Sequence, residues 1–354
     1  MSQIDQAVAI RKGEELDVAA VDRFMKQALP ELTGEPVIRQ YPGGASNLTY
    51  QVDYGDRSYV LRRPPFGKIA KSAHDMLREA RVMEALKPVY PYVPDIVAIC
   101  DDHEVLGCDF YVMQRLKGVI LRQDFPADLA LNEADTRKLC LNVIDKLVEL
   151  HQVDAKATGL DRLGKGAGYV QRQIGGWSER FRKARTDDVG DFEAVMAWLQ
   201  DKMPDDIGQC VIHNDYRFDN VVLNPDNPFE VIGVLDWEMA TIGDPLMDLG
   251  NSLAYWIQAD DDPGMQMLRR QPTHQPGMLS REEVVAYYLD RAGLSINSFD
   301  FYEVYGLFRL AVIIQQIYYR YYHGQTADKR FAAFGQAANY LQQRCQRLIQ
   351  ASKL

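Results

Sequence analysis

Apolar positions along the chain follow two periods, and the change from one to the other divides the chain into two parts. A helical spacing over residues 16–29 gives way to short runs with the two-residue period of strands. Gly55-Asp56 is typical of a hairpin turn between two of these runs. The predicted strands cover residues 37–41, 48–54, 58–62, 96–100 and 110–116.

One helix interrupts the strands, and helices dominate after Lys117-Gly118, the predicted hinge. Ser72 is the expected start of the interrupting helix, over 73–87, with prolines after it. Later helices are expected at 132–151, 169–185, 191–202, 245–257, 280–292, 299–322 and 327–351. The sequence therefore predicts an α+β fold with two lobes. Residues 1–117 form a small five-stranded antiparallel N-terminal lobe with one main helix, and residues 118–354 form a larger, mostly helical lobe.

Composition and charge exclude several classes of protein. The 354 residues are 47% apolar and 25% charged, as in ordinary globular proteins. The net charge of −10 argues against a nucleic-acid partner, which would favour a basic surface. No apolar run approaches the length of a membrane span. Five scattered cysteines without a C-x-x-C pair, and the absence of a signal peptide, favour a cytoplasmic location.

The chemistry concentrates in residues 211–250, where two apolar strand-like runs flank a set of oxygen-bearing side chains. Asp215 and Asn220 follow the first run, and Asp236 ends the second. Phosphoryl transfer needs one carboxylate at the attacking hydroxyl and two oxygen ligands for Mg²⁺ beside the nucleotide phosphates. The spacing of these three residues predicts Asp215 in the first role and Asn220 and Asp236 as the metal ligands.

The amino-acid sequence of this segment resembles that of one protein family. His-Asn-Asp-Tyr-Arg-Phe-Asp-Asn over 213–220, Leu-Asp-Trp-Glu over 235–238 and Gly-Asp-Pro-Leu-Met-Asp-Leu-Gly over 243–250 are similar to the aminoglycoside phosphotransferase and choline-kinase-like family. Within it, the chain is most similar to the kinase-like domain of acyl-CoA dehydrogenase-type fusion proteins. The resemblance covers roughly residues 35–345 and implies a protein-kinase-like fold.

A glycine-bearing turn between the first two strands is expected to cover the nucleotide phosphates. Gly43 and Gly44 carry no side chains, so backbone N–H groups could approach phosphate closely. Ser46 and Asn47 would add further donors. By itself such a turn is more often an ordinary hairpin. The interpretation as a phosphate-binding turn depends on the candidate residues that follow it in the sequence.

The resemblance assigns the phosphate-binding cation to the end of the third strand, where protein kinases have lysine and this chain has Arg62. Arg63 follows, and strand alternation puts the two arginines on opposite faces, so one of them is expected to face the nucleotide. Glu79 is the expected helix partner of that arginine. The backbone of Met113, Gln114 and Leu116 would contact the base, and main-chain contacts do not distinguish ATP from GTP.

Four further residues have expected roles around the catalytic segment. Arg217 either stabilises the transferred phosphoryl group or forms a salt bridge within its loop. His213 is expected to organise the loop rather than to act as a base. Asp244 and Asp248 are expected to tie down the loop and the helix that begins near Pro245.

These expectations combine into a small-molecule kinase that uses ATP and Mg²⁺ to phosphorylate a substrate hydroxyl. No Ala-Pro-Glu and no activation-loop-length segment follow Asp-Trp-Glu, which argues against a phosphorylation switch. A pseudokinase, binding nucleotide without turnover, is the alternative, and the arginine at the lysine position supports it. The sequence gives no indication of oligomeric state.

The acceptor is expected to bind on the C-terminal helices and on residues 259–279, a polar stretch that is typical of a mobile loop or lid. This region is rich in aromatic residues, which indicate either helix packing or a partly apolar pocket. Asp260–262 form only a short acidic wall for a polycationic aminoglycoside. The fusion-protein resemblance points to a hydroxylated acyl compound, while choline-like compounds and sugar alcohols remain open.

Overall fold

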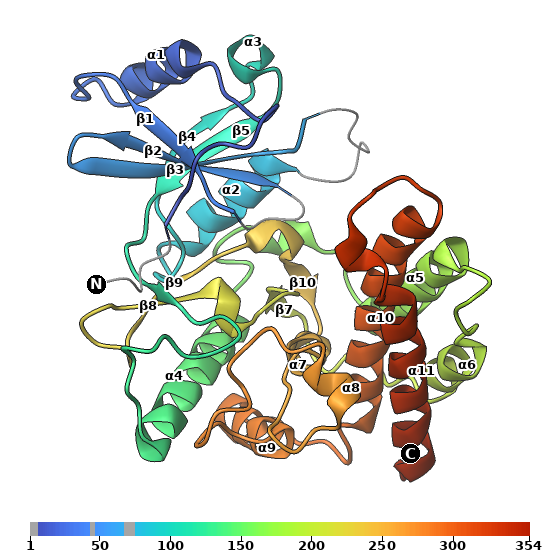
Figure 1. The fold of residues 1–354 in the computed structure, drawn as a ribbon. Coiled ribbons are helices and arrows are strands. Elements are labelled where there is room, and N and C mark those ends of the chain that lie inside the picture. The colour runs from blue at the N-terminus through green and yellow to red at the C-terminus, as the bar shows by residue number, and fades with distance from the viewer. Residues whose placement is uncertain (1–5, 43–46, 67–74) are drawn as a thin grey trace. The chain divides into compact units, whose positions relative to one another are not determined.

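The computed structural model describes residues 6–42, 47–66 and 75–354. The chain divides into two compact units, residues 1–120 with 220–240, and residues 121–219 with 241–354 (Figure 1). The first unit ends near the predicted hinge. The predicted lobes, 1–117 and 118–354, do not anticipate that residues 220–240 pack with the first unit.

The first unit contains the predicted five-stranded antiparallel sheet, in the order β1-β2-β3-β5-β4. Its β2–β3 hairpin pairs Tyr54 with Arg57, and Gly55 between them has a φ of +61°, which a glycine adopts without strain. The prediction of this sheet is confirmed. The strands are β1 (Val37–Gln40), β2 (Leu48–Tyr54), β3 (Arg57–Arg63), β4 (Ile96–Cys100) and β5 (Phe110–Gln114).

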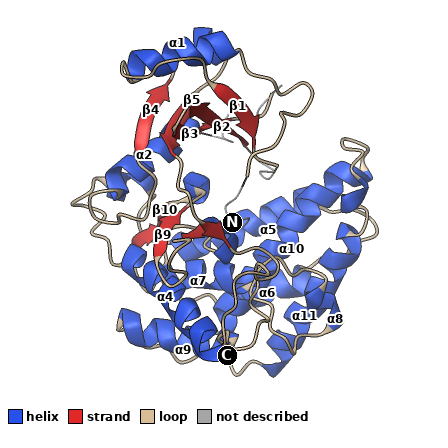
Figure 2. Cartoon of the chain, turned by 60° about the vertical axis from the view of Figure 1, so that its left-hand side comes forward, coloured by secondary structure: helices blue, strands red, loops and turns tan. Residues whose placement is uncertain are grey.

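Strand alternation gives the sheet an apolar face and a face that carries the nucleotide-site candidates. Helix α1 (Val18–Ala28) lies along the apolar face (Figure 2), where Tyr50, Leu61 and Val112 are fully buried. Successive residues of a strand point to opposite faces, so Arg62, which follows Leu61, points to the other face of the sheet.

Helix α2 (Met76–Leu86) is the main helix inserted between the strands, as predicted. It begins after Asp75, whose side chain accepts a hydrogen bond from the Arg78 backbone N–H. The expected start at residue 73 and the expected cap Ser72 lie outside the described residues. A single-turn helix, α3 (His103–Leu106), was not predicted.

Residues 220–240 belong to the first unit through a second sheet and a backbone bond. β6 (Val119–Ile120), β8 (Val221–Leu223) and β9 (Val231–Val234) form a three-stranded sheet in the order β6-β8-β9. The Val234 N–H also donates to the Tyr92 carbonyl oxygen at 2.7 Å. The stretch that carries Asn220 and Asp236 is thus fixed to the first unit.

The second unit is mainly helical (Figure 1) and includes a two-stranded sheet of β7 (Cys210–Ile212) and β10 (Thr241–Gly243). Each predicted helix is present, although α7 and α11 are shorter than expected. The helices are α4 (Glu133–His151), α5 (Tyr169–Ala184), α6 (Glu193–Asp201), α7 (Pro245–Leu253), α8 (Pro263–Gln266), α9 (Arg281–Ala292), α10 (Asp300–Tyr322) and α11 (Phe334–Ala351). None of the helices in the described part of the chain is long and apolar enough to cross a membrane.

Helices α7 and α10 cross at two glycines that allow their backbones to touch. A Cβ added at Gly306 would lie 2.1 Å from the Gly250 carbonyl oxygen. A Cβ added at Gly250 would lie 2.5 Å from the Tyr302 carbonyl oxygen. Because backbone atoms cannot rotate away as side chains can, this crossing requires glycine in both helices.

Gly306→Ala should therefore destabilise the protein by about 1–3 kcal/mol, since the new methyl group forces α7 and α10 apart. Gly175→Ala, in helix α5, is the matched control, because no atom lies within 4 Å of its added Cβ. In a helix interior that change should stabilise by about 0.5–1 kcal/mol. Chemical denaturation of the two variants measures both effects, and equal stabilities would contradict the close crossing.

Candidate active site

The expected catalytic residues lie on two connections that join short strands. Asp215 follows β7, and a 3-10 helix, Phe218–Asn220, leads into β8. Asp236 lies between β9 and a second 3-10 helix, Trp237–Met239. The Leu235 N–H donates to the Asn220 carbonyl oxygen at 2.8 Å, which brings the backbone beside Asp236 against Asn220. The two expected metal ligands therefore lie on adjoining backbone within the first unit.

Two of these positions have an unusual backbone conformation. Asn214, next to Asp215, has a φ of +65°, and Asp236 has a φ of +68°. Residues other than glycine rarely adopt positive φ, and the conformation persists where the surroundings hold it in place. Such positions occur more often at functional sites than elsewhere.

Arg62 lies at the centre of a cluster of charged side chains in the first unit. Its Nη2 atom lies 2.5 Å from Asp236 Oδ1 and 3.6 Å from Glu238 Oε2. Its Nε atom lies 3.3 Å from Glu79 Oε2, so the expected pairing of Arg62 with helix α2 is present. Glu238 also accepts a hydrogen bond of 2.6 Å from Asn47 Nδ2. One guanidinium therefore joins β3, α2 and the Asp-Trp-Glu segment.

The charges in this cluster do not balance. Three carboxylates surround one guanidinium, which leaves a formal charge of −2 if all are ionised. Glu79 is only 1% exposed, and burial raises its pKa even though the Arg62 charge acts to lower it. This environment favours an added cation.

Asn220 and Asp236 supply the kind of ligand that Mg²⁺ prefers, namely amide and carboxylate oxygens. Mg²⁺ in kinase sites takes one or two protein oxygens, with phosphate and water completing its shell. Within the described residues, no three His, Cys, Asp or Glu side chains are grouped as a protein-only metal site. The amide oxygen of Asn220 and the carboxylate oxygens of Asp236 thus fit Mg²⁺ by their chemistry.

Arg63, the neighbouring candidate, points away from this cluster. It is 5% exposed, and its guanidinium carbon lies 3.8 Å from the centre of the Phe66 ring. Its Nε atom donates to the Pro64 carbonyl oxygen at 3.1 Å. Arg62 and Arg63 therefore lie on opposite faces of the sheet, as strand alternation predicts.

Arg78, which the sequence did not single out, fastens helix α2 to the Asp-Trp-Glu segment. Its guanidinium donates to the carbonyl oxygen of Glu238 at 3.2 Å and to that of Ala240. Its partners lie more than 150 residues away, so only its position beside Glu79 could have drawn attention to it.

The second unit holds the expected base and its loop. Arg217 Nη2 lies 3.3 Å from Asp215 Oδ2, and Arg217 Nε lies 3.0 Å from Asp219 Oδ1. The guanidinium carbon lies 4.6 Å from the centre of the Tyr255 ring. Of the two roles considered for Arg217, the salt bridge within the loop is present in the structure.

Asp248 holds the backbone of the same loop, as expected. Its carboxylate accepts the His213 N–H at 2.8 Å and the Asn214 N–H at 2.7 Å. The His213 ring accepts the Asp215 N–H through Nδ1 at 3.2 Å, in agreement with its expected organising role. Asp244, also as expected, caps α7 by accepting the backbone N–H groups of Leu246 and Met247.

Three side chains from distant helices complete the support of Asn214. Arg309 donates to its carbonyl oxygen at 2.9 Å. Tyr169 and Asn251 donate to its side-chain oxygen at 3.2 and 3.1 Å. These contacts explain how a residue with positive φ stays in place.

The residues expected near the base of the nucleotide are placed only in part. Met113 pairs with Val60 in the sheet and lies on the same face as Arg62. The Gln114 N–H donates to the Asp95 carbonyl oxygen at 2.8 Å, and the Leu116 side chain packs over Gly233. Three predicted phosphate-loop residues lie outside the described residues, namely Gly43, Gly44 and Ser46.

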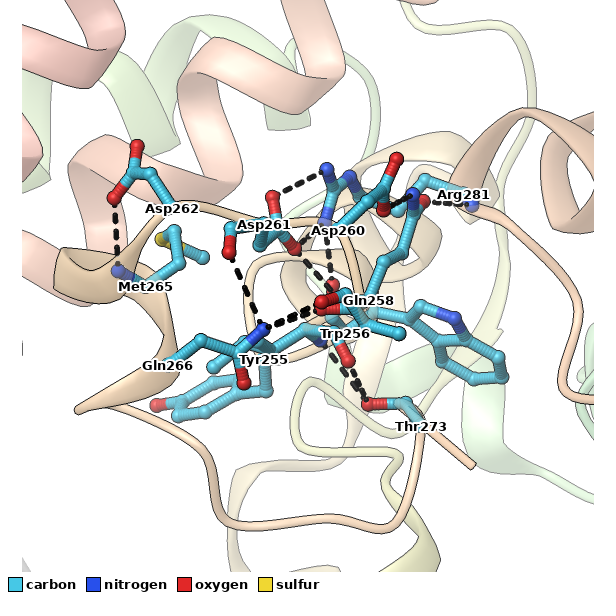
Figure 3. A network of polar contacts seen from close by, with 12 residues as sticks. Tyr255, Trp256, Gln258, Asp260, Asp261, Asp262, Met265, Gln266, Thr273 and Arg281 are labelled. Atoms are coloured by element: carbon cyan, nitrogen blue, oxygen red, sulfur yellow. Dashed lines mark hydrogen bonds and ion pairs between the residues drawn. The ribbon is translucent and has the colours of Figure 1, made fainter. Parts of the chain in front are cut away.

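The sequence suggested that residues 259–279 form a mobile loop with a short acidic wall at 260–262, but part of this tract is bound to other helices (Figure 3). The side chain of Asp261 is 4% exposed and accepts two bonds from Arg281, at 2.6 and 2.9 Å, and one from Arg344 at 3.0 Å. Burial alone would raise the pKa of Asp261, but the Arg281 bonds outweigh it and hold the pKa below its ordinary value. This carboxylate serves to join α9 and α11.

The rest of residues 259–279 is also anchored. Asp262 caps the short helix α8 and accepts a hydrogen bond of 2.5 Å from the Tyr340 hydroxyl. Thr273 bonds both backbone polar groups of Ile257 (Figure 3). The sequence suggested a mobile loop because the partners of these polar residues lie far along the chain.

Comparison with known proteins gives consistent results at the level of family and fold. The sequence matches the phosphotransferase enzyme family over residues 37–284. It is 32% identical to mouse acyl-CoA dehydrogenase family member 10 over 90% of this chain and 30% of that protein. It is 30% identical to rat acyl-CoA dehydrogenase family member 11 over 91% of this chain and 42% of that protein. The chain thus spans less than half the length of these curated relatives.

Solved structures resemble nearly the whole chain. A Ralstonia eutropha protein, provisionally described as an aminoglycoside phosphotransferase, has a TM-score of 0.81 and 27% identity, with 96% of this chain and 100% of that chain covered. Choline kinase from Cryptosporidium parvum has a TM-score of 0.64 at 12% identity, with 95% and 96% covered. Aminoglycoside phosphotransferase APH(4)-Ia, in complex with AMP-PNP and hygromycin B, has a TM-score of 0.57 at 16% identity, with 94% and 99% covered. The predicted kinase-like α+β fold is confirmed.

Asp261→Ala should destabilise the protein by about 3–5 kcal/mol, because it leaves two arginines partly buried without their carboxylate. Asp260→Ala is the matched control, since Asp260 is exposed and, among the described residues, accepts a side-chain hydrogen bond from the Gln258 amide alone. The folded-state pKa of Asp261 is lowered, so its contribution is complete above the unfolded carboxyl pKa of about 3.9 and is lost as the pH falls through the folded value.

Denaturation of both variants at neutral pH and below about pH 4 tests this structural role. The deficit of Asp261→Ala relative to the native protein should shrink on acidification. Equal stability of the Asp261 and Asp260 variants at neutral pH would show that the Asp261 bridges contribute nothing.

Proposed function

The chain belongs to the phosphotransferase enzyme family, and from that premise we propose that it transfers the γ-phosphoryl group of ATP to a hydroxyl group of a small molecule. The observation that carries the proposal is the Arg62 cluster, which holds Asp236 and Glu79 around one cation. A permanent charge, beside a carboxylate suited to a metal, matches the demands of a nucleotide triphosphate.

ATP is proposed as the phosphate donor. The solved complex of APH(4)-Ia contains AMP-PNP, an analogue of ATP, and shares the fold of this chain. In our proposal Arg62 binds phosphate and Asn47 adds a donor.

Asn220 and Asp236 are the proposed ligands of Mg²⁺. When bound, the ion would neutralise phosphate charge that develops during transfer. The surplus negative charge around Arg62 supports a cation there, because it would offset the repulsion among Asp236, Glu238 and Glu79.

Asp215 is the proposed base, or orienting group, for the acceptor hydroxyl. Its carboxylate could accept the hydroxyl proton or fix the hydroxyl in line with the phosphoryl group. Asp248 and Arg309 hold the backbone beside it, so little reorganisation is needed when the acceptor binds.

For the acceptor we propose a hydroxylated acyl compound. The curated relatives named acyl-CoA dehydrogenase support this class, although the chain spans less than half of each. A polycationic aminoglycoside is less favoured, because Asp261 and Asp262 already bind Arg281 and Tyr340 and are not available as a free acidic wall.

The second candidate is a nucleotide-binding pseudokinase, and one observation favours it. Arg62 Nη2 donates to Asp236 Oδ1 at 2.5 Å, so the carboxylate that is expected to bind Mg²⁺ already binds an arginine. Catalysis is still preferred, because all three oxygen-bearing residues of the phosphoryl-transfer set are present. Asp215 can be tested by its isosteric amide.

Asp215→Asn should lower turnover by about 100- to 10,000-fold, because the amide cannot accept the hydroxyl proton. Affinity for Mg-ATP should stay within a few-fold, since the expected metal and phosphate ligands are untouched. ADP release and nucleotide titration measure the two quantities, and Asp226→Asn in the exposed β8–β9 turn is the control. Comparable turnover in the Asp215 variant would remove that residue from the mechanism.

Arg62→Ala should weaken Mg-ATP binding by about tenfold or more, because it removes a charge-assisted contact to phosphate. Arg57→Ala is the control on the same strand, where Arg57 forms an exposed ion pair with Glu31. Calorimetric titration compares the two variants with the native protein. Equal affinities would mean that Arg62 does not contact the nucleotide.

A further inference from the structure

Behind the catalytic loop, the second unit contains a buried polar chain that none of the assigned roles uses. His151, the last residue of α4, is 3.1 Å from Asp248 Oδ2 through Nε2 and 2.6 Å from the Tyr288 hydroxyl through Nδ1. The side chains of His151 and Asp248 are 4% and 0% exposed, and Tyr288 is fully buried. Three helices, α4, α7 and α9, thus meet through one imidazole.

The geometry specifies what His151 does chemically. Nε2 faces a carboxylate, which only accepts, so Nε2 carries a proton. Nδ1 lies within hydrogen-bonding distance of the Tyr288 hydroxyl, which can both donate and accept. In this arrangement every polar group of the chain Tyr288–His151–Asp248 has a partner, which is the condition for burying such a network.

Asp248 is the point at which this chain reaches the loop. The oxygen that contacts His151 also accepts the His213 N–H, and the second oxygen accepts the Asn214 N–H. Rotation of the Asp248 carboxylate would break both backbone bonds next to Asp215. The His151 contact opposes that rotation.

We propose that His151, held by Tyr288, is a positioning residue of the phosphoryl-transfer site, acting through Asp248 on the backbone that carries Asp215. This rests on the proposed function. The competing explanation is a histidine that merely satisfies buried groups at the end of α4 and affects only global stability. The two explanations differ in where a substitution loosens the protein.

Three variants separate the contacts. His151→Leu removes both, and His151→Gln restores an N–H donor toward Asp248 with an oxygen that can accept from Tyr288. Tyr288→Phe removes a single hydroxyl and replaces the leucine variant in the test if that variant does not fold. Tyr287→Phe is the matched control, because its hydroxyl also joins α9 to α4, by donating to Asp145 at 2.9 Å, but has no contact with Asp248.

The first measurement is hydrogen exchange of the peptide 211–217 and of the strand 241–243, which pairs with β7. His151→Leu should accelerate exchange about tenfold or more in 211–217 and leave 241–243 unchanged, because only the loop loses its support. Tyr288→Phe should act in the same direction, and Tyr287→Phe should match the native protein. Equal acceleration of both segments, or none in either, would overturn the proposal.

The second measurement is turnover with the best acceptor available. His151→Leu should lower kcat by about 10- to 100-fold with KM for ATP within about threefold, and His151→Gln should recover most of that loss. Failure of the glutamine variant to recover activity would contradict a positioning role. If the native protein turns over no acceptor, the proposed function fails, while the exchange experiment still decides the role of His151.

Discussion

The buried charge of Arg62 is the constraint on which the first unit depends. A guanidinium that is 11% exposed must be matched by carboxylates, and these come from α2 and from the segment after β9. That requirement, together with the Arg78 bonds and the β6-β8-β9 sheet, accounts for the placement of residues 220–240 in the first unit. In the proposed function, the guanidinium of this cluster would bind phosphate, and the Asp236 carboxylate would bind the metal.

In the second unit the buried charge is negative, namely the carboxylate of Asp248. Burial alone would raise the pKa of Asp248, but bonds from His151 and from the backbone of His213 outweigh it and hold the pKa below its ordinary value. The ionised carboxylate in turn fixes Asn214 in its positive-φ conformation. In both units, therefore, a charge removed from water organises backbone around a residue with expected chemistry, Asp236 in one and Asp215 in the other.

Local signals in the sequence predicted much of the fold but few of the supporting contacts. The period of two over residues 48–54 and the period of 3.6 over α4 depend on neighbours in the chain, and both predictions are confirmed. Arg78, Arg309 and His151 find their partners about 95 to 160 residues away, so no local pattern could indicate them. The polarity of 260–262 suggested exposure for the same reason, because Arg281 and Arg344 were not known to cover Asp261.

Release of ADP from Mg-ATP across a panel of hydroxyl compounds tests the central claim most directly. The panel would hold hydroxyacyl-CoAs, choline-like compounds, sugars and aminoglycosides, with Asp236→Ala as the blank. The account predicts acceptor-dependent ADP release, fastest with a hydroxyacyl compound and absent from the blank. Tight binding of Mg-ATP without turnover of any acceptor would favour the pseudokinase, and failure to bind nucleotide at all would contradict the assignment of Arg62, Asn220 and Asp236.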